Sequence, residues 1–137
     1  MTPFWLSHHH PEEYARCYRL GALALCARCL GTYPVLFAAL LVQFAVHARL
    51  SHPLDVAAAV GLIVPATLDW AFGRFRPSAG TNAWRTLTGV LLGLGLGRSL
   101  FVHFQRPVPP MLIAQATLVT MVGVPVILAA YWRLRHR

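Results

Sequence analysis

The sequence predicts an all-α integral membrane protein, a four-helix bundle with a short interfacial helix before its first span. Three observations lead to this fold class. Of the 137 residues, 57% are hydrophobic and only 12% are charged. The mean hydropathy of +0.56 lies above the usual range of a soluble domain of this size. The apolar residues also form four long runs, and a helix needs about 20 such residues to cross a bilayer.

Residues 1–25 form an N-terminal segment that is too polar to span, so we expect it in the cytoplasm or at the membrane interface. Pro11 is followed directly by Glu12 and Glu13, an order typical of the first turn of a helix. The segment is therefore predicted to hold a short helix from about Pro11 to Leu25.

The transmembrane domain is predicted over residues 26–132, followed by a basic cytoplasmic tail over 133–137. The first span includes the cysteines at its start, because the purely apolar run alone is short for a bilayer. Pro34 lies inside this first span and predicts a kink there. The four predicted spans are residues 26–46, 54–72, 86–104 and 111–132.

Arginines orient the spans, because all twelve basic residues are Arg and they cluster beside apolar runs. In that position they meet anionic lipid headgroups, so we expect the lipid bilayer as partner and no nucleic acid. With the N-terminus inside the cell, two arginines lie outside and Arg98 lies within a span. This positive-inside bias predicts a multi-pass protein of the inner (plasma) membrane with both termini cytoplasmic. The arginines on the cytoplasmic side are then Arg16, Arg19, Arg28, Arg74, Arg76, Arg85, Arg133, Arg135 and Arg137.

A Cys-x-x-Cys pattern, Cys26-Ala27-Arg28-Cys29, begins the first span. Thiols three residues apart share a helical face, so they can bind one soft cation such as zinc or exchange as a redox pair. Arg28 and the helix N-terminus favour the thiolate, and a reducing cytoplasm disfavours a structural disulfide. Packing as small apolar residues is the third interpretation that stays open. The candidate metal ligands are Cys26, Cys29, Cys17, His8, His9 and His10.

Three polar residues fall at the same membrane boundary as this pattern. Asp69 ends the second span, and an acid there is costly unless it faces a partner, a water-filled cavity or the headgroups. Asn82 and Arg85 lead into the third span, and Arg85 is the expected counter-ion of Asp69. The sequence predicts a polar network of these three side chains, whereas Arg98 is expected to extend outward toward His103.

A stripe of small residues, Gly89, Gly93 and Gly97, continues the i, i+4 line from Arg85. Such stripes allow membrane helices to approach closely, so the stripe is predicted to be a helix-packing surface. A homodimer built on it is a further expectation.

These residues carry a resemblance to a known family. The chain resembles the domain of unknown function 2085 family of small prokaryotic multi-pass membrane proteins over about Pro11 to Gly93. The resemblance implies a multi-pass membrane protein with a Cys-His pair upstream of the Cys-x-x-Cys. Here His8 fits that pair, Ser7 stands where its cysteine would be, and Cys17 is the candidate replacement. The matching residues are Cys26-Ala27-Arg28-Cys29, Gly31, Tyr33, Pro65, Asp69, Asn82, Arg85, Thr88 and Gly89.

We therefore predict a membrane protein with a Cys/His site at its cytoplasmic face that binds a structural transition metal, zinc. One alternative is a membrane thiol oxidoreductase that uses Cys26 and Cys29. A second alternative is a small transporter or lipid-handling protein with Asp69 and Arg85 in its path. The sequence has no phosphate-binding loop, Ser/His/Asp order or H-E-x-x-H pattern, so a protein without enzymatic activity is favoured.

Overall fold

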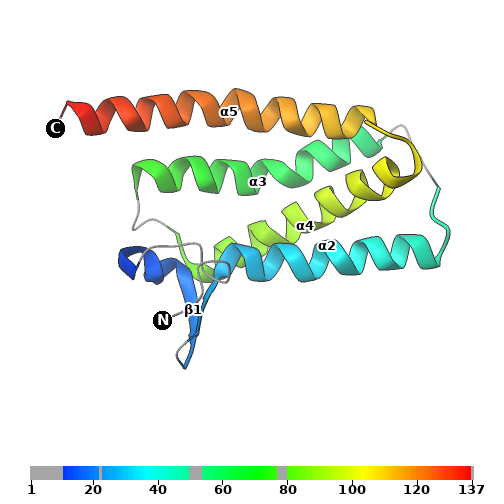
Figure 1. The fold of residues 1–137 in the computed structure, drawn as a ribbon, viewed down its shortest axis with the longest axis horizontal. Helices are drawn as coiled ribbons and strands as arrows, with labels where there is room; N and C mark the ends of the chain where they lie inside the picture. Colours follow the sequence, from blue (N-terminus) through cyan, green and yellow to red (C-terminus); the bar gives the residue numbers. More distant parts are fainter. Residues whose placement is uncertain (1–10, 22, 50–53, 77–79, 137) are drawn as a thin grey trace.

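Four long helices pack side by side in the computed structural model, which describes residues 11–21, 23–49, 54–76 and 80–136 (Figure 1). All four are long and apolar enough to cross a membrane. The predicted all-α four-helix bundle is therefore confirmed. In chain order the elements are the 3-10 helix η1 (Pro11–Arg16), strands β1 (Cys17–Leu20) and β2 (Leu23–Cys26), and helices α2 (Ala27–Ala45), α3 (Asp55–Phe75), α4 (Asn82–Gln105) and α5 (Pro110–Arg135).

The N-terminal helix expected from Pro11 to Leu25 is present only as η1, and the rest of that segment is an antiparallel β-hairpin. Cys17 pairs with Cys26 at one end of the hairpin. At the other end the chain reverses through Gly21, whose φ of +61° belongs to the left-handed region that favours glycine. The helix ends at Arg16 and the first strand begins at Cys17, which the Pro-Glu-Glu start alone does not reveal.

Helices α4 and α5 extend beyond the predicted spans 86–104 and 111–132. α4 begins at Asn82, where the Thr81 hydroxyl caps the helix by accepting a hydrogen bond from the Trp84 amide at 3.1 Å. α5 continues to Arg135, so Arg133 and Arg135 form its last turn instead of a separate tail. Arginines are stabilised at that position by the negative end of the helix dipole.

α4 is the central helix of the bundle, because α2 and α3 both pack on it while α5 packs mainly on α3. Small residues make the contact between α2 and α4 close. A Cβ atom added to Gly93 would lie 2.5 Å from the carbonyl oxygen of Thr32, and one added to Gly97 would lie 2.9 Å from the Ala39 Cβ. Gly89 likewise meets the backbone of α2 at Arg28. The glycine stripe is thus used within one chain, and the predicted homodimer would need another face.

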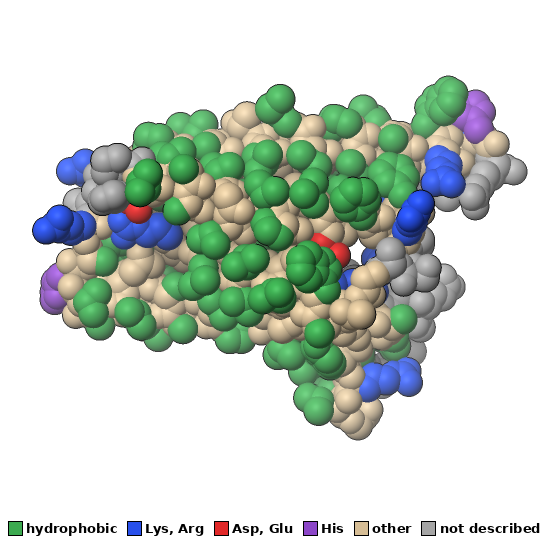
Figure 2. All heavy atoms as spheres, turned by 180° about the vertical axis from the view of Figure 1, so that it is seen from behind, with side chains coloured by type: hydrophobic (Ala, Val, Ile, Leu, Met, Phe, Trp, Pro, Cys, Tyr) green, Lys and Arg blue, Asp and Glu red, His purple; other side chains and the backbone are tan. Residues whose placement is uncertain are grey.

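On the face drawn in Figure 2, hydrophobic side chains cover the length of the bundle, and most charged side chains gather toward its two ends. Large apolar residues stand exposed along the bundle, such as Leu41 at 71% and Met121 at 70%. A surface of this kind is satisfied by lipid chains and not by water. The fold is that of a multi-pass membrane protein.

The hairpin, the start of α2, the end of α3, the start of α4 and the end of α5 all lie at one end of the bundle (Figure 1). We call this end the hairpin end. The other end of the bundle, with the loop from α4 to α5, is the opposite end. The sequence predicts that the hairpin end faces the cytoplasm, and this orientation stays a prediction.

Candidate functional site

Three thiols gather where the hairpin joins α2. Cys17 lies opposite Cys26 in the hairpin, and Cys26 is the residue that caps the N-terminus of α2. Cys29 follows in the first turn, where its thiol contacts that of Cys26 and interacts electrostatically with that of Cys17. Cys17 and Cys26 are each only 6% exposed, and Cys29 is half-buried. The β-turn brings Cys17 to this point, which a continuous helix would not do.

The donor set is soft and suits a metal such as zinc, but the described residues do not complete a site. Among residues 11–21, 23–49, 54–76 and 80–136, no group of three or more His, Cys, Asp or Glu side chains is arranged to hold a metal ion. The candidate ligands His8, His9 and His10 lie outside the described residues. A complete metal site would therefore need the three thiols to close around the ion and a further ligand from the N-terminal segment.

An ion pair connects α2 and α3 directly beside the thiols. Arg28, in the first turn of α2, donates from Nη2 to Oδ2 of Asp69 near the end of α3. Both side chains are largely buried, with 23% of Arg28 and 10% of Asp69 exposed. We expected Arg85 as the counter-ion of Asp69, and the structure gives this hydrogen bond to Arg28. The sequence signal for it was present, because Arg28 and Asp69 fall at the same predicted boundary.

Asn82 and Arg85 link the hairpin to α4. The amide Nδ2 of Asn82 donates to the Cys17 carbonyl oxygen at 3.2 Å, and its Oδ1 accepts from Arg85 Nη1 at 3.3 Å. Asp69 and Arg85 face the same small space, since a Cβ atom on Gly80 would lie 3.6 Å from Asp69 Oδ1 and 3.8 Å from Arg85 Nη2. The three predicted network residues therefore come together, with Arg28 as an additional member.

A family model described as "Predicted membrane protein (DUF2085)" matches residues 9–98 of the chain. The chain belongs to this family. The match covers the hairpin, α2, α3 and most of α4, and so all the described residues of the thiol group and the polar network. No curated protein and no solved structure matches the chain.

A second polar group of this DUF2085 protein lies at the opposite end, and the sequence reasoning missed it. Arg98 does not extend toward His103. Its Nη2 donates to Asp55 Oδ2 at 2.6 Å and to the Arg49 carbonyl oxygen at 2.8 Å, and its Nη1 donates to Gln43 Oε1 at 3.0 Å. Asp55 at the start of the second span and Arg98 late in the third occupy the same level, which is the signal that could have revealed the pair.

Proposed function

We propose that this DUF2085 protein binds a soft transition-metal ion, Zn²⁺, at the hairpin end through Cys17, Cys26 and Cys29. A histidine from the N-terminal segment, with His8 first in line, supplies the remaining ligand. The observation that carries the proposal is the hairpin register, which sets Cys17 opposite Cys26, the residue about one helical turn before Cys29.

The chemistry of the three residues supports this function. Thiolates are the preferred ligands of zinc in structural sites, and such sites commonly combine three Cys with one His. Zinc binds cysteine as the thiolate, so its binding releases the thiol protons. Cys17 would take the ligand position that the family pattern gives to a cysteine at Ser7. The metal would then hold the hairpin to the first turn of α2.

The polar network has a supporting role in the proposal. Asn82 holds the Cys17 carbonyl and Arg85 holds Asn82, so α4 fixes the strand that carries one thiol. The Thr86 hydroxyl donates to the Ala27 carbonyl oxygen at 3.1 Å, next to Cys26. We propose that these bonds orient the thiol group at the cytoplasmic boundary, as the arginine distribution predicts.

Metal analysis of the purified, reduced protein tests the proposal. We expect about one zinc per chain, as a four-ligand structural site holds a single ion. Cys26→Ser with Cys29→Ser should abolish binding, and Cys17→Ser or His8→Ala should weaken it. His47→Ala is the matched histidine control, because His47 lies after α2 at the opposite end. A metal-free native protein, or full zinc content in the double variant, would rule the site out.

A thiol oxidoreductase is the second candidate, and the contact between the Cys26 and Cys29 thiols favours it. The pair would reduce a substrate disulfide to two thiols while becoming a disulfide itself, so two electrons and two protons pass to the substrate. Thiol titration of the same sample separates the candidates. A metal-free protein whose Cys26 and Cys29 cycle reversibly to a disulfide supports the oxidoreductase and contradicts zinc binding.

A small transporter is the third candidate, and its path would be a cavity of about 460 Å³ that is lined by Asp69, Gly80 and Trp84. Flux of small ions and solutes through liposomes containing the protein tests this role. Asp69→Asn should lower the flux if Asp69 lies in the path, and an unchanged flux removes it from consideration.

A further inference from the structure

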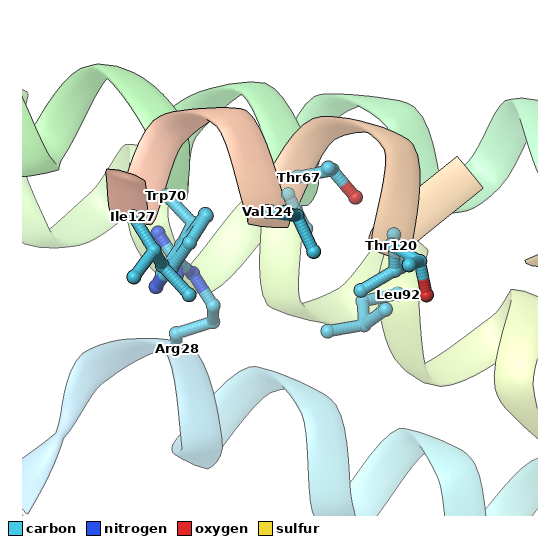
Figure 3. Close-up of a pocket in the computed structure, with 10 residues that line it drawn as sticks. Arg28, Thr67, Trp70, Leu92, Thr120, Val124 and Ile127 are labelled. Carbon is cyan, nitrogen blue, oxygen red and sulfur yellow. The ribbon is translucent and has the colours of Figure 1, made fainter. Parts of the chain in front are cut away.

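A separate, apolar cavity of about 490 Å³ lies between α2, α3, α4 and α5. Figure 3 shows how its walls are arranged along the helices. Arg28 reaches from α2 toward Trp70 of α3 and Ile127 of α5 at one end, and Leu92 and Thr120 lie farther along. The cavity therefore begins at the level of the hairpin end and runs into the apolar part of the bundle.

The packing of the helices explains why this space exists. α5 packs mainly on α3 and only lightly on α4. Gly123 of α5 lines the cavity, and a Cβ atom added there would have no heavy atom within 4 Å. An empty apolar space loses dispersion contacts, and in a bilayer lipid chains are available to fill it.

Arg28 is the single charged residue among the described residues that line the cavity. Its Nη2 is used by Asp69, but its Nε is buried and has no hydrogen-bond partner in the described part of the chain. A buried donor without a partner is unfavourable, and donors of this kind are rare in native structures. The cavity is thus apolar along its length, and the arginine with the unsatisfied donor borders it at the hairpin end of the bundle.

Positive charge surrounds the same end of the cavity. Arg74 lies over the ring of Trp70, with 5.9 Å between its guanidinium carbon and the ring centroid. Arg133 follows Ile127 by less than two helical turns on α5 and is exposed. The complementary ligand is an amphiphile with an anionic headgroup and an apolar chain.

We propose that this cavity binds one acyl chain of an anionic phospholipid, with the phosphate accepting a hydrogen bond from the guanidinium of Arg28, whose side chain is 23% exposed. The acyl chain lies along α3 and α5. The headgroup lies at the level of Trp70, because tryptophan is enriched at the membrane–water interface. This site is independent of the proposed metal, since neither Cys17, Cys26 nor Cys29 lines the cavity.

Tryptophan quenching by brominated lipids tests the proposal, because Trp70 lines the cavity. The full-length protein is placed in phosphatidylcholine vesicles that contain a small fraction of lipid with brominated chains. We expect brominated phosphatidylglycerol to quench better than brominated phosphatidylcholine, with a relative affinity on the order of tenfold for one charge-assisted hydrogen bond. Trp70→Phe should remove this difference, which assigns it to the cavity.

Two further variants distinguish the cavity from the general lipid contact. Gly123→Leu fills the space without meeting a neighbour at Cβ, and Arg28→Gln removes the donor. Both should bring the preference for phosphatidylglycerol down to that of the bulk lipid. Gly61→Leu is the matched control on α3, where an added Cβ atom also meets nothing within 4 Å, and it should change nothing.

Three results would overturn the proposal. The first is equal quenching by the two brominated lipids in the native protein. The second is an unchanged preference in Gly123→Leu. The third is stronger displacement by free oleate than by phosphatidylglycerol, which would assign the cavity to a fatty acid.

Discussion

The two ends of the bundle use the same pair of residue types in different ways. α3 supplies an aspartate near each of its ends, and each aspartate binds an arginine of a neighbouring helix. At the opposite end Arg98 of α4 binds Asp55 and also donates to Gln43 and to a backbone carbonyl. At the hairpin end Arg28 of α2 binds Asp69 and keeps a buried Nε without a partner.

This difference separates a structural pair from a binding site. A guanidinium inside a membrane is tolerated when its donors are satisfied by fixed groups, as they are around Arg98. The ring of Phe101 completes that environment, with the guanidinium carbon 5.7 Å from its centroid. Arg28 has the same charge with fewer fixed partners, and it borders a cavity. We propose that this partly exposed arginine beside a cavity enables the hairpin end to select a ligand.

The largest effect is expected from Asp55→Asn, which leaves the Arg98 charge without its carboxylate. Only 21% of Arg98 and 16% of Asp55 is exposed, so the lost interaction is poorly replaced by water. We expect the free energy of unfolding to fall by about 3 kcal/mol. Denaturation with sodium dodecyl sulfate, followed by circular dichroism, measures it. Adding Arg98→Met should recover most of the loss, and a double variant as unstable as the single one would contradict this account.

A smaller effect is expected from Asp69→Asn, because Arg28 keeps the proposed phosphate as a second partner. We expect a loss of about 1 kcal/mol in vesicles with anionic lipid and a larger loss in pure phosphatidylcholine. The same unfolding measurement in the two lipids provides the comparison. If Asp55→Asn shows the same lipid dependence, the two ends do not differ in the way proposed.

The smallest effect is expected from Thr86→Val at the hairpin end. Its hydroxyl donates to Ala27 of α2 and lies 3.2 Å from the Tyr18 hydroxyl, so the change removes contacts between elements. We expect a loss of about 0.5 kcal/mol and a weaker retention of zinc. Thr88→Val is the control, since the Thr88 hydroxyl donates to the Arg85 carbonyl oxygen within α4. Equal zinc retention in both variants would argue against a role for Thr86 in holding the hairpin.

The spans and their common boundary could be predicted because lipid imposes long apolar runs and leaves polar residues to the ends. Asp69, Asn82 and Arg85 were found in this way. The hydrogen bond between Arg28 and Asp69 could not be predicted, because the rotation of α2 and α3 about their axes decides which side chains reach the carboxylate. The hairpin was missed because apolar and polar residues do not alternate along its short strands. The decisive signal is Gly21, whose φ lies in the left-handed region.

The glycine contacts have a mechanical consequence. Because Gly93 and Gly97 bring the backbones of α2 and α4 together, we expect these two helices to move as one rigid unit. The two ion pairs connect α3 to this unit at two separate points, through Arg28 on α2 and Arg98 on α4. α5 is attached mainly through α3. Loss of the Asp69 pair would release the hairpin end of α3 from α2, whereas the close contact of Gly95 with Ala59 and the Asp55 pair would still hold the other end of α3 on α4.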